Sequence, residues 1–409
     1  MSDSLVSPLG VPMPDGWQLR SIGELCVKIG SGATPKGGAA VYTAAGTNFI
    51  RSQNVFDHYF SSAGLAHIDD LAAEKLSGVA VRERDVLLNI TGDGETIARC
   101  CVAPQWIIPA RVNQHVMILR VSDALSPDYL QRYLSQPAMR VHMLNHNSGG
   151  SRRALTKAQV AGFKIAVPAL KEQEYIAAAL GALDEKITIN GRIATTADHL
   201  SADIFRHATL TSSTHFTEHA LSATAEFING RAFTKDATGT GRMVVRIAEI
   251  NNGPGSSTVY NDIDVPEKHL ARPGDVLFSW SGSLMVTRWF RPEAIINQHI
   301  FKCVPKNSFP RWLVSQLVHR KIDEFRAIAA SKATTMGHIQ RKHLDEPVLV
   351  PTREVLSSLD ARIAPLWERA LLAERENLAL AALRDTLLPQ LMSGRLRVRD
   401  AEKIVEDHV

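Results

Sequence analysis

The sequence has few cysteines and no long apolar run. Its four cysteines, Cys26, Cys100, Cys101 and Cys303, show no C-x-x-C spacing, and the adjacent pair is badly placed to form a disulfide. No run of about 18 apolar residues occurs, and the amino terminus lacks the basic and apolar segments of a secretory signal. We therefore expect a cytoplasmic protein that is neither exported nor inserted in a membrane.

Catalytic signatures are also missing. The chain has no G-x-x-x-x-G-K-[ST] phosphate loop, no H-E-x-x-H and no G-x-S-x-G. His142 and His146 are four residues apart and could share a helix face as metal ligands, but no carboxylate or cysteine follows at ligand spacing. We therefore expect no catalytic residues, no metal and no cofactor.

Net charge is small, but its distribution is uneven. The 46 Lys and Arg against 42 Asp and Glu leave a formal charge of +4. Residues 82–165 contain 11 basic and 6 acidic side chains, and residues 311–342 contain 7 and 2; the segments that follow each block are neutral or acidic. Basic blocks of this kind are typical of nucleic-acid-binding surfaces, although ordinary solvated faces can give the same pattern.

The chain repeats itself at a separation of about 190 residues, as expected for duplicated domains. The repeated segments keep one order in both halves, and the separation falls from 195 to 176 along the chain, as small deletions would cause. They are "NFIRSQNV" with "MVVRIAEI", "DVLLNITG" with "DVLFSWSG", "RVNQHVMILRV" with "IINQHIFKCV", "FKIAVPAL" with "EPVLVPTR", and "ALDEKI" with "SLDARI".

Each half has short strand-like runs followed by a long helical segment, which predicts an α+β fold. Ser126 is expected to cap a helix that begins at Pro127, and Thr156 with Gln159 to form a capping box. The expected organisation is a first domain at 1–165, a central helix at 166–215, a second domain at 216–350, a C-terminal helix at 351–395 and a tail at 396–409.

Both helical segments have apolar residues at threes and fours, which predicts that they pair as an antiparallel coiled coil. Asn190 and Asn377 interrupt the two seams, and polar seam residues usually fix register. Pro365 should kink or break the second helix, and Pro389 with Gly394 should end it.

These features resemble the specificity (S) subunits of type I restriction-modification systems over residues 14–400. The resemblance rests on the duplicated layout and on "GWQLRSIGELCVKIGSGATP", "RDVLLNITG", "GDVLFSWSG", the two "NQH" strands, "VPALKEQEYIAAALGALDEKI" and "LRDTLLPQLMSGRLRV". The second helix departs from the pattern because it opens "VPTREVLSSLD" and lacks the Glu172-Gln173 pair of the first.

The resemblance implies a chain without catalytic activity that recognises DNA in a restriction-modification complex. Two target recognition domains would each read half of a split double-stranded DNA sequence, and the paired conserved helices would hold them apart and bind two methyltransferase (M) subunits. Whether restriction (R) subunits also join is left open, and no membrane partner is expected. Candidate residues for the partner interface lie on the helical seams: Leu180, Leu183, Ile187, Leu366 and Leu380.

Helix geometry agrees with a split target. A seam of roughly 40 residues gives a rod of about 60 Å, and DNA rises about 3.4 Å per base pair. Two recognition domains on such a rod could contact sites up to roughly 15 base pairs apart.

The loop "NSGGSRRALTKAQ", residues 147–159, is the strongest candidate for DNA contact. Its glycines let the backbone approach a phosphate and its arginines supply charge; a plain flexible loop before a capped helix is the alternative. The candidates here are Ser151, Arg152, Arg153 and Lys157, and those of the matching segment 331–342 are Lys332, Thr334, Thr335 and Arg341.

Further candidates come from the repeated strands and from basic loops. Arginine can pair with guanine, amides can read adenine and hydroxyls can bind phosphate, although each of these residues could equally serve the fold. The set comprises Arg51 with Arg246, Thr91 with Ser281, Asn113-Gln114-His115 with Asn297-Gln298-His299, and the basic residues Lys36, Arg99, Arg231, Lys235 and Arg288.

Two other functions are weighed against the specificity subunit. A stand-alone DNA-binding protein would use the same two domains without a methyltransferase, and would purify as a monomer that binds DNA tightly. An enzyme whose site no motif reveals would bind or turn over S-adenosylmethionine.

Overall fold

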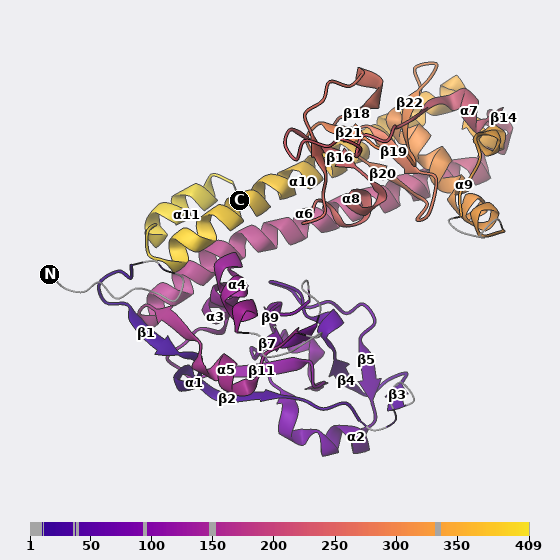
Figure 1. Ribbon diagram of the computed structural model, residues 1–409. Coiled ribbons are helices and arrows are strands. Elements are labelled where there is room, and N and C mark those ends of the chain that lie inside the picture. The colour runs from indigo at the N-terminus through magenta and orange to yellow at the C-terminus, as the bar shows by residue number, and fades with distance from the viewer. Residues whose placement is uncertain are drawn as a thin grey trace. The chain divides into compact units, whose positions relative to one another are not determined.

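A computed structural model describes residues 10, 12–35, 37, 41–92, 96–146, 153–331 and 337–408. The chain forms two compact units, one of Met1–Lys186 with Leu380–Val409 and one of Ile187–Ala379 (Figure 1). In the part of the chain that is described, no helix has the length and apolarity needed to cross a membrane.

The first unit contains a four-stranded sheet of order β2-β11-β7-β9 and a five-stranded sheet of order β3-β5-β4-β10-β6. β1 pairs with β13, and β12 with β8. The bounds are β1 Gln18–Ser21, α1 Ile22–Leu25, β2 Cys26–Ser31, β3 Tyr42–Thr43, β4 Thr47–Ile50, β5 Ala66–Ile68, α2 Asp70–Lys75, β6 Ala80–Val81, β7 Val86–Asn89, β8 Thr91–Gly92, β9 Cys100–Val102, β10 Ala110–Val112, β11 Val116–Val121, α3 Pro127–Ser135, α4 Pro137–Asn145, β12 Arg153–Ala154, α5 Lys157–Gly162 and β13 Lys164–Val167.

The second unit repeats this plan. Its sheets have the orders β15-β22-β19-β20 and β17-β16-β21-β18, and β14 pairs with β23. In both units the second sheet contains one parallel pair, β4 with β10 and β16 with β21. The bounds are β14 Phe216–Ala220, α7 Leu221–Thr224, β15 Ala225–Asn229, β16 Arg242–Val245, α8 Ile247–Asn252, β17 Tyr260–Asn261, β18 Leu270–Ala271, β19 Val276–Ser279, β20 Met285–Arg288, β21 Ala294–Ile296, β22 Ile300–Pro305, α9 Arg311–Ser331 and β23 Pro347–Pro351. The predicted α+β class and internal repeat are confirmed.

Two long helices, α6 (Leu170–Thr211) and α10 (Arg353–Met392), run antiparallel (Figure 1). In the first unit Arg384 Nη1 donates to Asp184 Oδ1 at 2.8 Å. In the second unit Asn190 Nδ2 donates to Glu376 Oε2 at 2.9 Å, and Asn377 Nδ2 to the Ile187 carbonyl at 3.0 Å. The two seam asparagines therefore cross-link the pair, which fits their expected role in register.

Expectations about the end of α10 are partly wrong. The helix runs through Pro365 and Pro389 without interruption and ends at Met392. Gly394 follows with φ +68°, and its N–H donates to the Leu391 carbonyl at 3.0 Å. The left-handed glycine therefore ends the helix, as such residues commonly do. The expected tail contains α11, Val398–Glu406.

Helix starts in the first unit follow the sequence signals. The Ser126 hydroxyl accepts from the Tyr129 N–H at the start of α3, and Thr156 and Gln159 form the predicted capping box of α5. The helix that begins at Pro127 ends at Ser135, and Pro137 begins a second helix, α4. The residue before a proline is pushed away from helical geometry.

Candidate nucleic-acid interface

Both Asn-Gln-His triplets occupy the same place, in the turn between an inner strand of one sheet and an inner strand of the other. Asn113 and Asn297 are buried, with 5% and 7% of their surface exposed. Gln114 and Gln298 are exposed, and His115 and His299 are half-buried. The glutamine is therefore the most exposed residue of each triplet.

The Asn113 side chain supports the turn, which was the alternative to a base contact, and the backbone of both asparagines bonds to a neighbouring strand. Asn113 Oδ1 accepts from the His115 N–H at 3.0 Å, and the Asn113 N–H donates to the Ile50 carbonyl at 3.0 Å. The Asn297 N–H donates to the Val245 carbonyl at 3.1 Å. The backbone N–H at this position therefore ties the turn to the parallel neighbour strand in both units.

A glycine lies against each triplet and lets a second loop approach it. A Cβ atom on Gly32 would lie 1.6 Å from the Val112 carbonyl oxygen, and a Cβ atom on Gly230 would lie 2.1 Å from the backbone carbonyl oxygen of Asn297. No side chain fits at such distances. Each glycine therefore fixes the loop after β2 or β15 directly beside the glutamine.

Strand β7 and its repeat β19 end at the same place. The Ile90 N–H donates to the His115 carbonyl at 3.0 Å, and the Trp280 N–H donates to the His299 carbonyl at 3.0 Å. In the first unit Thr91 Oγ1 lies 2.5 Å from His115 Nδ1. The structure thus brings together two candidate residues, Thr91 and His115, in the first unit.

The two basic loops leave from these strand ends. Ala154 pairs with Thr91, and His338 forms a bridge with Ser281. Residues Lys36, Ser151, Arg152, Lys332, Thr334 and Thr335 lie outside the described residues, as does the side chain of Arg153. The described residues next to these segments, Ala154 and His338, pair with Thr91 and Ser281.

Arg51 and Arg246 occupy equivalent positions but use their guanidinium groups within the fold. Each lies at the N-cap of a short helix. Arg51 Nη2 donates to the Gly64 carbonyl at 2.6 Å. Arg246 forms two hydrogen bonds to Glu249, at 3.0 and 2.6 Å. These contacts support the fold alternative for both residues.

The expected position of Arg288 in a loop is wrong. It is the last residue of strand β20, and its side chain is 4% exposed. It lies 2.9 Å from Glu374 and 3.1 Å from Asp198, with its guanidinium 4.5 Å above the Trp367 ring. Burial and two carboxylate partners leave no group to reach DNA.

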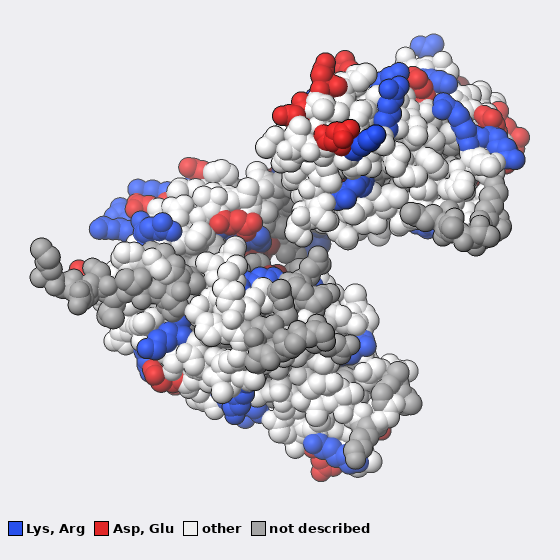
Figure 2. Space-filling model, in the orientation of Figure 1, with Lys and Arg blue, Asp and Glu red and all other residues white. Residues whose placement is uncertain are grey.

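Exposed cations remain at four of the predicted positions. Lys157 lies on the first turn of α5, Arg231 and Lys235 follow β15, and Arg341 lies near the Ser281 bridge. Arg99, half-buried, has its guanidinium 5.0 Å above the Phe56 ring. On the face in Figure 2, Lys and Arg form separate groups with acidic side chains between them.

Sequence reasoning missed Thr34 and Trp280. The Thr34 hydroxyl donates to Gln114 Oε1, and the Trp280 indole N–H donates to Asn229 Oδ1 at 2.8 Å with its ring 5.1 Å from His299. Thr34 lies two residues after the glycine that touches the triplet, but nothing in the sequence brings positions 34 and 114 together.

The expected partner-interface leucines lie inside the chain. Leu180 and Leu183 are 0% exposed and Leu380 is 1% exposed. Leu366 and Ile187 are half-buried, and Leu366 packs on a cluster of alanines from both long helices. Leu180, Leu183 and Leu380 are therefore not available to a partner, whereas Ile187 and Leu366 stay candidates for the interface.

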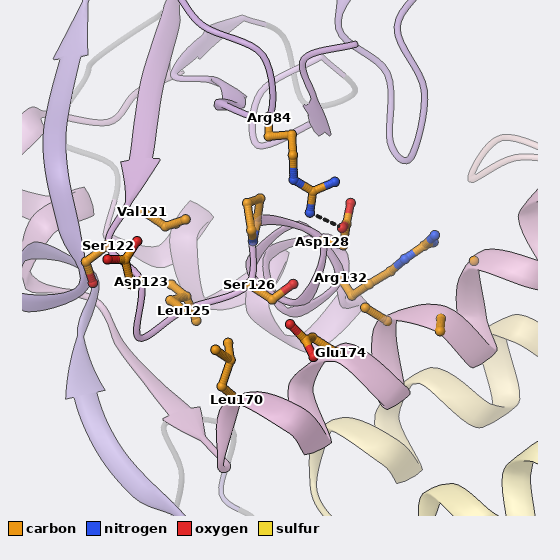
Figure 3. A pocket seen from close by; sticks show the side chains of 14 residues that line it. Arg84, Val121, Ser122, Asp123, Leu125, Ser126, Asp128, Arg132, Leu170 and Glu174 are labelled. Atoms are coloured by element: carbon orange, nitrogen blue, oxygen red, sulfur yellow. Dashed lines mark hydrogen bonds and ion pairs between the residues drawn. The ribbon is translucent and has the colours of Figure 1, made fainter. Parts of the chain in front are cut away.

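A pocket of about 560 Å³ lies between α3 and α6 in the first unit (Figure 3). Arg84 Nη2 donates to Asp128 at 2.6 Å across its rim, and Arg132, on its wall, pairs with Asp184. The described residues contain no group of three His, Cys, Asp or Glu placed to hold a metal. Ion pairs within the fold account for these charged side chains.

Comparison with known proteins supports the resemblance seen in the sequence. Residues 14–197 match the model of the type I restriction modification DNA specificity domain, so this part of the chain contains such a domain. Across 95% of both chains the protein is 18% identical to the type I restriction enzyme MjaIX specificity subunit of Methanocaldococcus jannaschii.

A solved relative has the same fold. The S subunit of a type I restriction-modification system from M. genitalium superposes with a TM-score of 0.57 at 15% identity, covering 96% of this chain and 99% of that one. The resemblance seen in the sequence is therefore confirmed for the domain at residues 14–197 and for the fold. For this specificity family, sequence recognition on DNA is the implied role.

Proposed function

We propose that the chain is the DNA-specificity subunit of a type I restriction-modification enzyme and reads a bipartite target. The observation that carries this proposal is that one polar site occurs twice. Each unit has its own pair of sheets and its own triplet with an exposed glutamine. Two separate copies of one site suit a target made of two half-sites.

The chain would supply recognition and leave methyl transfer to partners. We assign no catalytic step to the described sites. Two methyltransferase subunits would dock on the long helices, and restriction subunits could join the same complex. An assembly that acts on chromosomal DNA would operate in the cytoplasm.

The test is to co-express the chain with the methyltransferase of its own system and to map methylated sites in the host genome. The expected result is one motif with two specified halves and an unspecified gap of fixed length. Methylation without sequence preference, or a continuous motif, would contradict the proposal. Tight, specific DNA binding by a chain that never co-purifies with a methyltransferase would favour the stand-alone DNA-binding protein.

A further inference from the structure

The two exposed glutamines differ in how their amide groups are held. Gln114 Oε1 accepts a hydrogen bond from the Thr34 hydroxyl. The equivalent of Thr34 after the second glycine is Ala232, which has no hydroxyl. Among the described residues, the Gln298 side chain has no hydrogen-bond partner, and its backbone N–H donates to the Arg231 carbonyl at 2.9 Å.

This difference decides which end of each amide faces a ligand. A glutamine amide has one acceptor oxygen and two N–H donors. With its oxygen engaged by Thr34, Gln114 presents the NH2 group as a donor. Gln298 can present the oxygen and the nitrogen together, because nothing in its described surroundings fixes either atom.

The bases of DNA distinguish these two arrangements. In the major groove guanine offers two neighbouring acceptors, N7 and O6, whereas adenine offers the N7 acceptor beside the N6 donor. An outward NH2 group can donate to both guanine acceptors but would meet the adenine N6 amine as a second donor. A free glutamine amide can pair with adenine through both atoms.

We propose that Gln114 and Gln298 are the equivalent base-reading residues of the two units, and that Thr34 is a positioning residue that makes Gln114 favour guanine over adenine. This inference rests on the proposed DNA-recognition function. Their equivalent positions beside Gly32 and Gly230, and the exposure of both glutamines, support the same role in both units. Gln298 accordingly favours adenine.

The test uses the chain assembled with its methyltransferase and a double-stranded DNA library with both half-sites randomised. For Gln114→Ala we expect one position in one half-site to lose roughly tenfold preference while the other half-site is unchanged. Gln298→Ala is the matched variant and should affect one position of the opposite half-site only.

The positioning role is tested by Thr34→Val, which keeps the shape of the side chain and removes the hydroxyl. Adenine should then be accepted at the position where the wild type selects guanine, with activity on the guanine target retained, and Thr34→Ser should restore the preference. A merely structural role would lower activity on all sequences equally, and that result would overturn the assignment.

Two other results would also overturn it. One is a preference that is unchanged in Gln114→Ala, and the other is a uniform loss on every sequence, which indicates a phosphate contact. A wild-type complex without any sequence preference would instead contradict the proposed function itself, so the two failures are distinguishable.

Discussion

Arginine side chains in this protein fall into two groups by what their guanidinium contacts. Arg246 and Arg288 each lie against carboxylates within the fold, whereas Arg231 and Arg341 are exposed. The sequence contains no signal that separates the groups, because the partners of Arg288 lie 90 and 86 positions away. Charge alone suggested Arg246 and Arg288 as DNA contacts, but in the structure their guanidinium groups pair with carboxylates of the fold.

We predict that Arg288→Met destabilises the fold by about 3 kcal/mol, because it leaves Asp198 and Glu374 without their shared cation. Burial raises the pKa of Glu374, and loss of Arg288 would raise it further. Urea unfolding measures the effect. Arg206→Ala is the control, since that pair is 69% and 62% exposed and should contribute less than about 1 kcal/mol. Equal effects of the two variants would refute the structural role.

Arg152→Ala combined with Arg153→Ala should act on DNA binding instead of folding. Each phosphate contact that is lost should reduce the slope of log affinity against log salt by about 0.9. Measurement of binding by the assembled complex at several salt concentrations gives this slope. A slope equal to that of the wild type would mean that these arginines do not contact DNA.

His58 should make stability depend on pH. Burial, together with the charge of Arg132, lowers its pKa to about 4 from 6.5, and its Nδ1 lies 2.8 Å from Arg132 Nη1 and 3.1 Å from Gln131 Nε2. The unfolded chain therefore takes up a proton near pH 6.5 that the folded chain takes up only near pH 4.

The free energy of unfolding should consequently fall by about 3 kcal/mol as pH drops from about 6.5 to about 4. The variant His58→Asn tolerates the left-handed backbone at this position, where φ is +73°. Denaturant titrations at several pH values should show a flatter profile for the variant. Parallel profiles for variant and wild type would show that another group is responsible.

At the scale of elements, the long helices have two kinds of apolar residue. Leu180 and Leu380 are buried, whereas Leu200 and Leu372 are 47% and 56% exposed. Periodicity predicted that the helices pair. Leu200 fits the apolar spacing of the sequence, but Ala197, Ser201 and Phe205 are the residues buried in this part of α6. A helix repeat of 3.6 residues drifts against a heptad, so a seam shifts face over a long helix.

Leu200→Glu and Leu372→Glu should release the methyltransferase while the chain stays folded, because exposed leucines on these helices are available to a partner. Leu180→Glu should unfold the first unit instead, since it places a charge in the core. Co-purification and circular dichroism separate the two outcomes. Leu71→Glu on α2, 63% exposed, is the control and should do neither. Retained co-purification of both helix variants would exclude this surface.

At the scale of the whole molecule, the duplication explains most of what the sequence could predict. Segments that align in the sequence form equivalent strands. They even share a backbone hydrogen bond, from Ile90 to His115 in the first unit and from Trp280 to His299 in the second. What the sequence could not predict lies in contacts between distant positions, such as that of Thr34 with Gln114. Local patterns determine strands and helix starts, but they do not reveal which side chains meet across a sheet.

The central claim is that the duplicated halves read DNA separately. Contributions to binding from well-separated sites add nearly independently. Exchanging residues 216–350 for the matching segment of another specificity subunit should therefore alter one half-site only. The gap should stay fixed because α6 and α10 are retained.

Mapping methylated sites across a genome that expresses the exchanged chain with its methyltransferase tests this claim most directly. The account predicts one altered half-site, one unchanged half-site and an unchanged gap. Altered bases in both halves, or a gap of different length, would contradict it.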